Sequence, residues 1–398
     1  MGESLFSGLK VIDCASWIAG PVAATMLSDY GADVIKIEPP GEGDPWRQSQ
    51  PLPGRKVDHY WQLTSRNKRS LALDLKHPEG QAILYKLVAE ADVFITNYPL
   101  PVRERLKLSS SHLLPLNPRL IYGSFTAYGE EGDEAAKTGF DSTAYWARTG
   151  LMDMVRADEA TPPSRSMPGM GDHPSGTGLY AAIVSALYRR EKTGQGGVVR
   201  SSLLQNGLWA NGCAVQIRLF GEDMKLRPPR HEPPNALANH YRTRDNRWFI
   251  MALFNEQRQL RSFLAAIGRE DLTDDPRFAT PAARKENAQE LCSVLDGIFA
   301  TRDLAEWRQI LDGVGLTFGI VATVNEALHD PQMRHCGALA SFDDGEGMTV
   351  MTPFHIDGVE KVPARRAPAV GQHNEDVLRE AGYSGDQIER LRGLGVLA

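Results

Sequence analysis

Short apolar runs alternate with amphipathic segments through the first third of the chain. An apolar strand at 9–13 leads into an Ala-rich helix at about 21–30 and then into a second strand at 33–37. Further strands are predicted at 70–74, 92–96 and 120–125, with a helix at 78–91. Because strand–helix–strand units place successive strands parallel, this order predicts a doubly wound, Rossmann-like α/β domain.

The second half of the chain has a different texture. A long helix is predicted at 175–192, ended by the turn at 193–197, and another helix at about 202–219. Proline then interrupts any regular element at Pro228, Pro229, Pro233 and Pro234.

These prolines mark the entry to a smaller α+β domain. It begins with a hairpin at 241–250 that turns at Asp245-Asn246, and helices follow to about residue 327. The tail at 372–395 returns to helix. We therefore divide the chain into a large domain at 1–224, a small domain at 225–328 and a C-terminal return to the large domain at 329–398.

Composition restricts the class of protein. The 398 residues are 42% hydrophobic, enough for a large core and two or more domains. The net charge of -6 argues against nucleic acid or an anionic membrane as partner. Neither a run of about 18 apolar residues nor a signal-peptide pattern is present in the sequence, so we expect a cytoplasmic protein. The four scattered cysteines predict neither a zinc site nor disulfides.

The first strand-to-helix turn tests for a dinucleotide cofactor. The stretch at 15–21 contains one glycine, Gly20, followed by Pro21, and therefore lacks the Gly-x-Gly-x-x-Gly loop that cradles a pyrophosphate. This argues against a nicotinamide enzyme. The helix N-terminus could still receive another nucleotide, although an ordinary turn explains the sequence equally well.

Basic residues cluster beside two of the predicted strands. Arg66, Lys68 and Arg69 precede one strand, while Arg103 and Arg105 follow another. Loops at strand ends of an open α/β sheet commonly bind ligands, and phosphate groups would suit these side chains. Taken singly, each is expected to be a solvated surface charge.

The segment at 169–178 is the strongest candidate for chemistry. Glycines flank Asp172 and allow the backbone to approach a ligand closely, while Pro174 suits the first turn of the following helix. On local sequence alone, an aspartate here is expected to cap the helix and His173 to be structural.

The order of motifs along the chain resembles the class III CoA-transferases, the CaiB/BaiF family that includes formyl-CoA and carnitine CoA-transferases. The motifs that carry the resemblance are Gly20-Pro21, the stretches at 31–40, 43–47, 67–75 and 92–98, Arg105-Leu106, Gly171-Asp172, the stretch at 193–196 and the tail at 371–378. Each piece is a weak signal, but their common order is specific.

The resemblance implies that Asp172 is a nucleophile that forms covalent intermediates while CoA moves from an acyl-CoA to a small carboxylic acid. It implies an interlocked, ring-like homodimer and no tightly bound cofactor or metal, with CoA acting as substrate. The residues it implies for CoA binding are Ala15, Ser16, Trp17, Lys68, Leu71, Asn97, Tyr98, Arg105 and Lys137.

Two other functions compete with CoA transfer. α-Methylacyl-CoA racemases share the fold, but their proton transfer uses a His-Asp pair, and the corresponding residues here are Phe140 and Asp141. Because a phenyl ring cannot transfer a proton, we favour CoA transfer. A CoA-binding protein without turnover is the second alternative, against which an intact Asp172 argues.

The sequence departs from the oxalate-type members of the family at one place. The stretch at 251–256 has no glycine where those members carry a glycine-rich loop, so formyl or oxalyl specificity is not expected. Trp146, Trp209 and Phe254 could line an acyl pocket, but we expect a core position for each.

Overall fold

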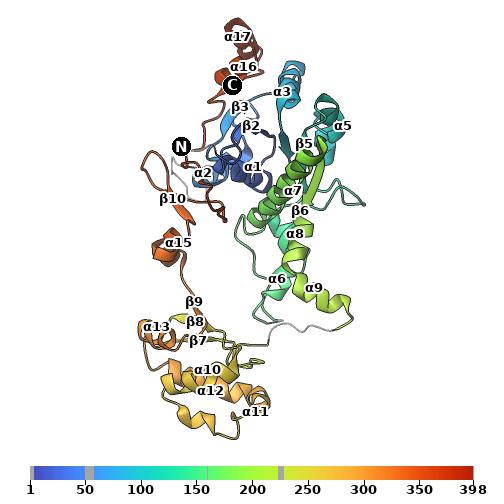
Figure 1. Cartoon of the computed structure of the whole chain (residues 1–398). Helices are drawn as coiled ribbons and strands as arrows, with labels where there is room; N and C mark the ends of the chain where they lie inside the picture. The colour runs from blue at the N-terminus through green and yellow to red at the C-terminus, as the bar shows by residue number, and fades with distance from the viewer. Residues whose placement is uncertain (1–3, 50–57, 159, 223–227, 398) are drawn as a thin grey trace. The chain divides into compact units, whose positions relative to one another are not determined.

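The computed structural model describes residues 4–49, 58–158, 160–222 and 228–397. The chain divides into two compact units (Figure 1). The large unit comprises Met1–Asp153, Ser164–Glu222 and Gln332–Ala398, and the small unit comprises Met154–Pro163 and Asp223–Pro331. The predicted boundary between 224 and 225 lies outside the described residues.

The large unit is built on a six-stranded parallel sheet. Its strands are β1 (Lys10–Asp13), β2 (Asp33–Glu38), β3 (Arg69–Ala72), β4 (Val93–Thr96), β5 (Ile121–Thr126) and β6 (Gly197–Ser202). The strand order is β3-β2-β1-β4-β5-β6, the order of a doubly wound fold. The predicted parallel α/β sheet is confirmed.

Sequence patterns missed the sixth strand. We predicted a turn at 193–197 followed by a helix from 202, whereas β6 occupies Gly197–Ser202 and pairs with β5. This strand lies at the edge of the sheet and ends in Arg200-Ser201-Ser202. It therefore lacks the continuous apolar run that marks the buried strands.

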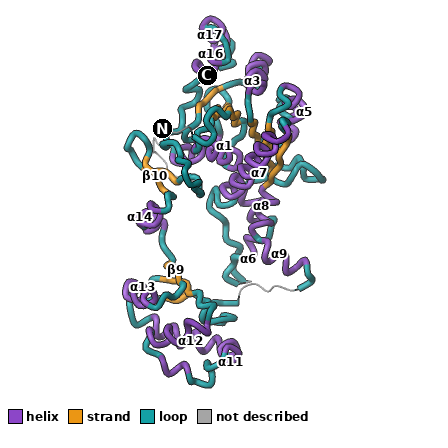
Figure 2. The backbone as a smooth tube through the Cα atoms, in the orientation of Figure 1, coloured by secondary structure: helices purple, strands orange, loops and turns teal. Residues whose placement is uncertain are grey.

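Helices and short turns complete the large unit (Figure 2). They are α1 (Ala19–Asp29), η1 (Pro45–Gln48), α2 (His59–Ser65), α3 (Pro78–Glu90), α4 (Leu100–Arg105), α5 (Ser110–Leu113), η2 (Leu114–Leu116), η3 (Asp141–Ala147), α6 (Leu151–Met154), α7 (Asp172–Thr193), α8 (Leu203–Ala210), α9 (Gly212–Leu219), α16 (Asn374–Glu380) and α17 (Gly385–Gly393). A hairpin of β10 (Leu339–Ser341) and β11 (Met348–Val350) also belongs to this unit.

Alternating side chains of the central strands enter two separate hydrophobic cores. In β1, Val11 belongs to the core that includes α1 and α7, while Ile12 belongs to the core that includes α3, α16 and α17. In β4, Val93 and Phe94 divide in the same way. Both faces of the sheet are therefore buried, as parallel sheets require.

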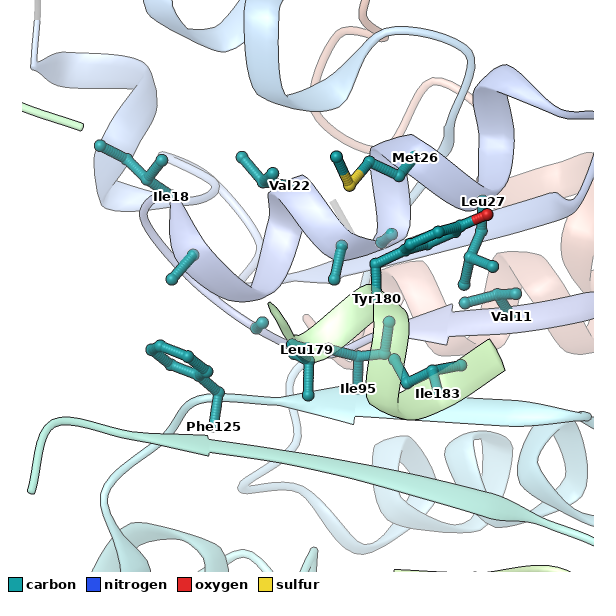
Figure 3. Close-up of a cluster of buried hydrophobic side chains, with 14 of the residues drawn as sticks. Val11, Ile18, Val22, Met26, Leu27, Ile95, Phe125, Leu179, Tyr180 and Ile183 are labelled. Carbon is teal, nitrogen blue, oxygen red and sulfur yellow. The ribbon is translucent and has the colours of Figure 1, made fainter. Parts of the chain in front are cut away.

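Close packing of α1 against α7 determines where the glycine-rich segment lies. Val22 and Leu27 of α1 share one core with Leu179 and Ile183 of α7 (Figure 3). A Cβ placed on Gly176 would come within 2.7 Å of Val22 Cγ1 and 2.8 Å of the Ala19 carbonyl oxygen. Glycine at 176 thus allows the two helices to touch.

Two predicted helices are each divided in two. The helix expected at 202–219 breaks at Asn211, whose side-chain amide donates to the carbonyl of Thr149 at 2.8 Å, giving α8 and α9. The tail breaks after α16 at Gly382, whose φ of 82° ends the helix, and Ser384 caps α17. Both breaks need contacts or dihedrals that periodicity does not report.

The small unit contains a three-stranded antiparallel sheet and its own core. The sheet consists of β7 (His240–Arg242), β8 (Trp248–Met251) and β9 (Phe318–Ile320) in the order β7-β8-β9. The predicted hairpin is present, with Asn246 at a φ of 59°, but β9 was not predicted. The helices are α10 (Glu256–Ala266), η4 (Glu270–Thr273), α11 (Pro281–Glu286), α12 (Ala288–Phe299), α13 (Leu304–Gly313), α14 (Val324–His329) and, at the junction with the large unit, α15 (Pro331–His335).

Across the described residues, every helix is too short or too polar to cross a membrane.

We predict that Gly176→Ala destabilises the large unit, because the added methyl group collides with Val22 and with the backbone of Ala19. The expected loss is about 1–3 kcal/mol of unfolding free energy, measured by urea unfolding followed by circular dichroism. Gly212→Ala is the matched control, since a Cβ at that helical position meets no atom within 4 Å. Equal stability of the two variants would contradict the role given to Gly176.

Candidate functional site

Asp172 is the first residue of α7 and lies at the carboxyl edge of the parallel sheet. Gly171 occupies the N-cap position, and no side chain caps this helix end. The Asp172 side chain is half-buried, and among the described residues none is recorded as a hydrogen-bond donor to its carboxylate. The alternative in which Asp172 serves only as a helix cap therefore lacks the bond that a cap requires.

Asp141 holds the backbone in front of Asp172. Its Oδ2 accepts hydrogen bonds from the backbone N–H of Gly169 at 2.9 Å and of Gly171 at 3.4 Å. A Cβ on Gly171 would lie 2.7 Å from the ring of Tyr145, so only glycine allows this approach. Asp141 thereby ties the glycine-rich segment to η3, which is a π-helix.

Sequence reasoning gave Asp141 no role. In the sequence, Asp141 stands out only as the neighbour of Phe140, at the position of the racemase His-Asp pair. A buried aspartate followed by a π-helix leaves no periodic signal in a sequence, and its partners lie 28 and 30 residues further along the chain. The one hint in the sequence is the pair Gly169 and Gly171, because a glycine-rich turn needs a partner to hold its backbone in place.

The environment of Asp172 favours its protonated form. Burial, and secondarily the negative charge of Asp141, raise the pKa of the Asp172 carboxyl to about 7. Burial and the neighbouring Arg66 lower the pKa of His173, so its imidazole is neutral at pH 7. The His173 ring covers Gly169, where an added Cβ would lie 2.9 Å from its Cδ2.

The first turn of the sheet lies next to this segment. Ser16 and Asn97, which follow β1 and β4, exchange two hydrogen bonds of 2.7 Å between the Ser16 backbone and the Asn97 amide. Ile18 Cδ1 lies 3.7 Å from a Cβ built on Gly169. Because parallel strands end at one edge, the structure brings the predicted turn and the Gly-Asp segment together.

Trp17 adopts an unusual conformation in this turn. Its φ is 65°, and its N–H donates to Asp44 Oδ1 at 3.2 Å. The Trp17 ring contacts Trp46 and Phe140, with centroids 5.9 and 5.6 Å away. A bulky residue keeps a positive φ only where its surroundings enforce that conformation. The strained backbone of Trp17 therefore suggests that its conformation serves the site.

A buried network of charges supports the turn from below. Lys36 pairs with Asp44 at 2.8 Å and donates to the carbonyl of Ala15. Lys68 bonds Asp13 at 2.8 Å and the carbonyls of Pro21 and Thr64 at 2.8 Å each. Each of these charged groups is buried and paired, so the network holds the backbone of the turn in place.

Two residues predicted to contact CoA are therefore enclosed. The Lys68 ammonium is fully engaged in the network beneath the turn, and the Leu71 side chain packs in the core that contains α3. The structure gives both side chains a supporting position. The main chain of Leu71 pairs with β2 in the sheet.

The remaining predicted contacts follow strand ends or lie on the surface. Tyr98 follows β4 and is half-buried, and burial raises the pKa of its hydroxyl, which bonds Ser16. Arg105 is exposed, and within the described residues it forms no recorded ion pair. Lys137 is exposed and pairs with Glu134 at 2.9 Å.

Most of the clustered basic residues serve the fold. Arg66 binds the buried Asp29, Arg69 binds Asp33 and Glu380, and Arg103 is buried among Ser124, Glu130 and the carbonyls of Tyr98 and Phe125. Arg66 and Arg69 also lie at the amino end of β3, whereas ligands of such sheets bind at carboxyl ends. Of this cluster, Arg105 is the side chain left for a phosphate.

Exposure corrects the expectation for two aromatic residues. Trp209 is 87% exposed and Phe254 is 78% exposed, so neither lies in a core. Trp146 is half-buried in η3. Phe140 is 54% exposed beside Asp141, where a racemase would need a proton-transferring group.

The described residues contain no group of three or more side chains suited to hold a metal ion.

Comparison with known proteins identifies the family. The model of CoA-transferase family III matches residues 6–374. The chain belongs to CoA-transferase family III. It is 32% identical over 397 residues to (R)-2-hydroxy-4-methylpentanoate CoA-transferase of Clostridioides difficile, covering 98% of each chain. It is 31% identical to cinnamoyl-CoA:phenyllactate CoA-transferase of Clostridium sporogenes, covering 98% of this chain and 96% of that relative.

Solved structures show the same fold. A CaiB/BaiF family protein from Brucella suis is 29% identical with a TM-score of 0.84, covering 96% of this chain and 100% of that chain. Rv3272 from M. tuberculosis is 26% identical with a TM-score of 0.83, covering 94% and 99%. This family III protein is therefore a CoA-transferase, an enzyme that uses acyl-CoA as substrate.

We predict that Asp172→Asn stabilises the protein more at pH 8 than at pH 5. The folded pKa of about 7 lies above the usual value near 4, so ionisation costs stability as pH rises from about 4 to 7. Removing the carboxyl removes a cost on the order of 2 kcal/mol at pH 8, after allowance for partial solvent screening. Urea unfolding at both pH values measures the difference.

Asp275→Asn is the control of opposite sign for this experiment. Bonds from Arg277 lower the pKa of Asp275 to about 2, so its ionised form stabilises the fold. That variant should lose stability above pH 4. A stability gain for Asp172→Asn that is equal at pH 5 and pH 8 would show that the Asp172 pKa is not raised.

Proposed function

We propose that this CoA-transferase moves CoA between carboxylic acids through covalent intermediates on Asp172. The observation that carries the proposal is a half-buried carboxylate without a recorded donor among the described residues, at the start of α7 and in front of glycine backbone. Because its oxygens accept no hydrogen bond from the described residues, this carboxylate is available to attack a carbonyl carbon.

The proposed reaction is a series of acyl transfers between oxygen and sulfur. The Asp172 carboxylate attacks the thioester carbonyl of the donor, and the tetrahedral adduct breaks its C–S bond, which releases CoA as thiolate and leaves a mixed anhydride of Asp172 and the donor acid. The thiolate attacks the aspartyl carbonyl, releasing the donor acid and forming aspartyl-CoA thioester. The acceptor carboxylate then displaces CoA to give a second anhydride, and the thiolate takes the acceptor acyl group and frees Asp172. No step requires a metal or a redox group.

The raised pKa of Asp172 suits this sequence. A carboxylate formed near pH 7 in a partly desolvated position is less strongly solvated than one in water, and so is a better nucleophile. The first turns of α1 and α7 meet at this edge, and their N-terminal amide groups favour negative charge on a developing oxyanion.

We place CoA along the same edge of the sheet. The turn at 15–17 and the Asn97-Tyr98 pair lie nearest to the Gly-Asp segment and would follow the pantetheine arm. Arg105 and Lys137, both exposed cations, would attend the phosphates. Lys68 and Leu71 would act from beneath, by fixing the backbone of the turn and of β3.

The partner in the proposed assembly is a second copy of the chain. Trp209, Leu219 and Phe220, from α8 and the end of α9, are 87%, 74% and 78% exposed, and large apolar side chains exposed in this way suit a protein contact. Both chain ends belong to the large unit, with the small unit inserted between them. That chain order is the one that an interlocked homodimer of two-domain rings requires.

We predict that Asp172→Ala abolishes CoA exchange while CoA still binds, because the nucleophile is lost and the proposed CoA contacts remain. Transfer should fall by about 1,000-fold or more, measured by mass spectrometry of acyl-CoA products. Borohydride or hydroxylamine treatment of wild-type protein with donor should mark residue 172. Asp133→Asn, an exposed carboxyl of the same unit, is the control. Full activity of Asp172→Ala would refute the assignment.

We predict that Asp141→Asn shifts the pH dependence of kcat/KM to lower pH. The amide oxygen can still accept the N–H groups of Gly169 and Gly171, but the charge that raises the Asp172 pKa is gone. In the wild type, kcat/KM should rise with pH through about 7, and in the variant about half to one pH unit lower.

Asp141→Ala separates the two roles of this residue. It removes both the charge and the acceptor, so kcat should fall even where Asp172 is fully ionised. A pH profile that is unchanged in Asp141→Asn would show that Asp141 has no electrostatic effect on the nucleophile.

A further inference from the structure

Two exposed aromatic rings stand beside the nucleophile. Trp17 is 37% exposed and Phe140 is 54% exposed, and their rings meet edge to face with centroids 5.6 Å apart. Phe140 immediately precedes Asp141, which binds the backbone in front of Asp172. Trp17 immediately precedes Ile18, which packs against Gly169. The two rings therefore stand on the two segments that touch the Gly-Asp turn.

The surroundings of this aromatic pair are apolar on the nearest side. Met170, within the turn itself, is 51% exposed, and Trp46 continues the aromatic contact of Trp17 at 5.9 Å. The Phe140 N–H is bonded to Thr143 Oγ1 at 2.9 Å, which fixes the backbone that carries the ring. A hydrocarbon group placed against these rings would be removed from water, which is favourable. The rings are already held in place, so little side-chain entropy would be lost.

Charge at the site disfavours a second carboxylate. Among the described residues, the charge that shifts the pKa of Asp172 is the negative one of Asp141. Three buried cations near the site are paired within the fold: Lys36 with Asp44, Lys68 with Asp13 and Arg66 with Asp29. The exposed cations Arg105 and Lys137 are assigned to the phosphates of CoA in the proposed function. A dicarboxylate would therefore bring a further negative charge beside Asp141 with none of these five cations left to pair with it.

We infer that the site selects monocarboxylic acids whose side chain is apolar, and that Trp17 and Phe140 form the wall that receives this side chain. The inference rests on the proposed function, since it names the substrate class of the same nucleophile. Phe140 is the specificity-determining residue, because its ring is the more exposed of the pair and its neighbour Asp141 fixes its distance from the nucleophile.

A competition between two acids of similar size, one with an apolar and one with a charged end group, tests this inference. In 4-methylpentanoate the chain ends in an isopropyl group, and in succinate a planar carboxylate occupies the same place. The full-length protein, as purified, is incubated with unlabelled 4-methylpentanoyl-CoA as donor. Equal amounts of two acceptors are added together: ¹³C-labelled 4-methylpentanoate and unlabelled succinate. Mass spectrometry of the initial products gives the ratio of the two kcat/KM values, and we expect at least about 100-fold more labelled 4-methylpentanoyl-CoA than succinyl-CoA.

Substitution of Phe140 then tests the wall itself. Phe140→Ala should lower the ratio by about 10-fold or more through a loss in kcat/KM for 4-methylpentanoate, while Phe140→Leu should keep most of it. Phe140→Arg should raise transfer to succinate by supplying the missing cation. Tyr188→Ala, another exposed aromatic residue of the large unit, is the matched control and should leave the ratio unchanged.

Each outcome decides between the inference and the proposed function. Equal use of the two acids, a preference for succinate, or an unchanged ratio in Phe140→Ala would overturn the inference alone. Covalent labelling of Asp172 without transfer to 4-methylpentanoate would also overturn the inference alone. If neither acid accepts CoA and residue 172 is never labelled, the proposed function fails together with it.

Discussion

The carboxylate of Asp141 fixes the backbone on which the whole site depends. By accepting two N–H groups of the glycine-rich turn, it sets the path of the chain into α7 and so the position of Asp172. The same charge opposes ionisation of Asp172. One side chain therefore both positions the Asp172 carboxyl and favours its protonated form up to near-neutral pH.

Close helix packing supplies the second constraint. Because Gly176 lets α7 lie against α1, the starts of both helices meet at one edge of the sheet, above the ends of β1 and β4. The buried charges beneath the turn keep its backbone in place, with Lys36 and Lys68 donating to its carbonyls and to aspartates. Such a network is costly to break, which rigidifies the edge that a substrate must meet.

Basic side chains that the sequence offered as phosphate ligands differ in whether the fold leaves them free to bind. The ammonium group of Lys68 could bind a phosphate, but it donates its hydrogen bonds to Asp13 and to two backbone carbonyls. Arg103 and Arg105 are two residues apart, yet one is buried in the fold and the other is exposed. Residue type indicates what a side chain can bind, but only packing determines whether it is free to do so.

The sequence by itself determined the parallel α/β sheet and the central hairpin of the small unit, because apolar periodicity and turn residues are local signals. The order of its motifs carried the resemblance to the family, and that resemblance, rather than the local sequence, made Asp172 the candidate nucleophile. It did not reveal β6, the break at Asn211 or the role of Asp141, which depend on partners distant along the chain. Nor did it show that Trp209 and Phe254 are exposed. Burial, charge pairing and a raised pKa arise only when separate segments meet, and the tertiary structure alone decides them.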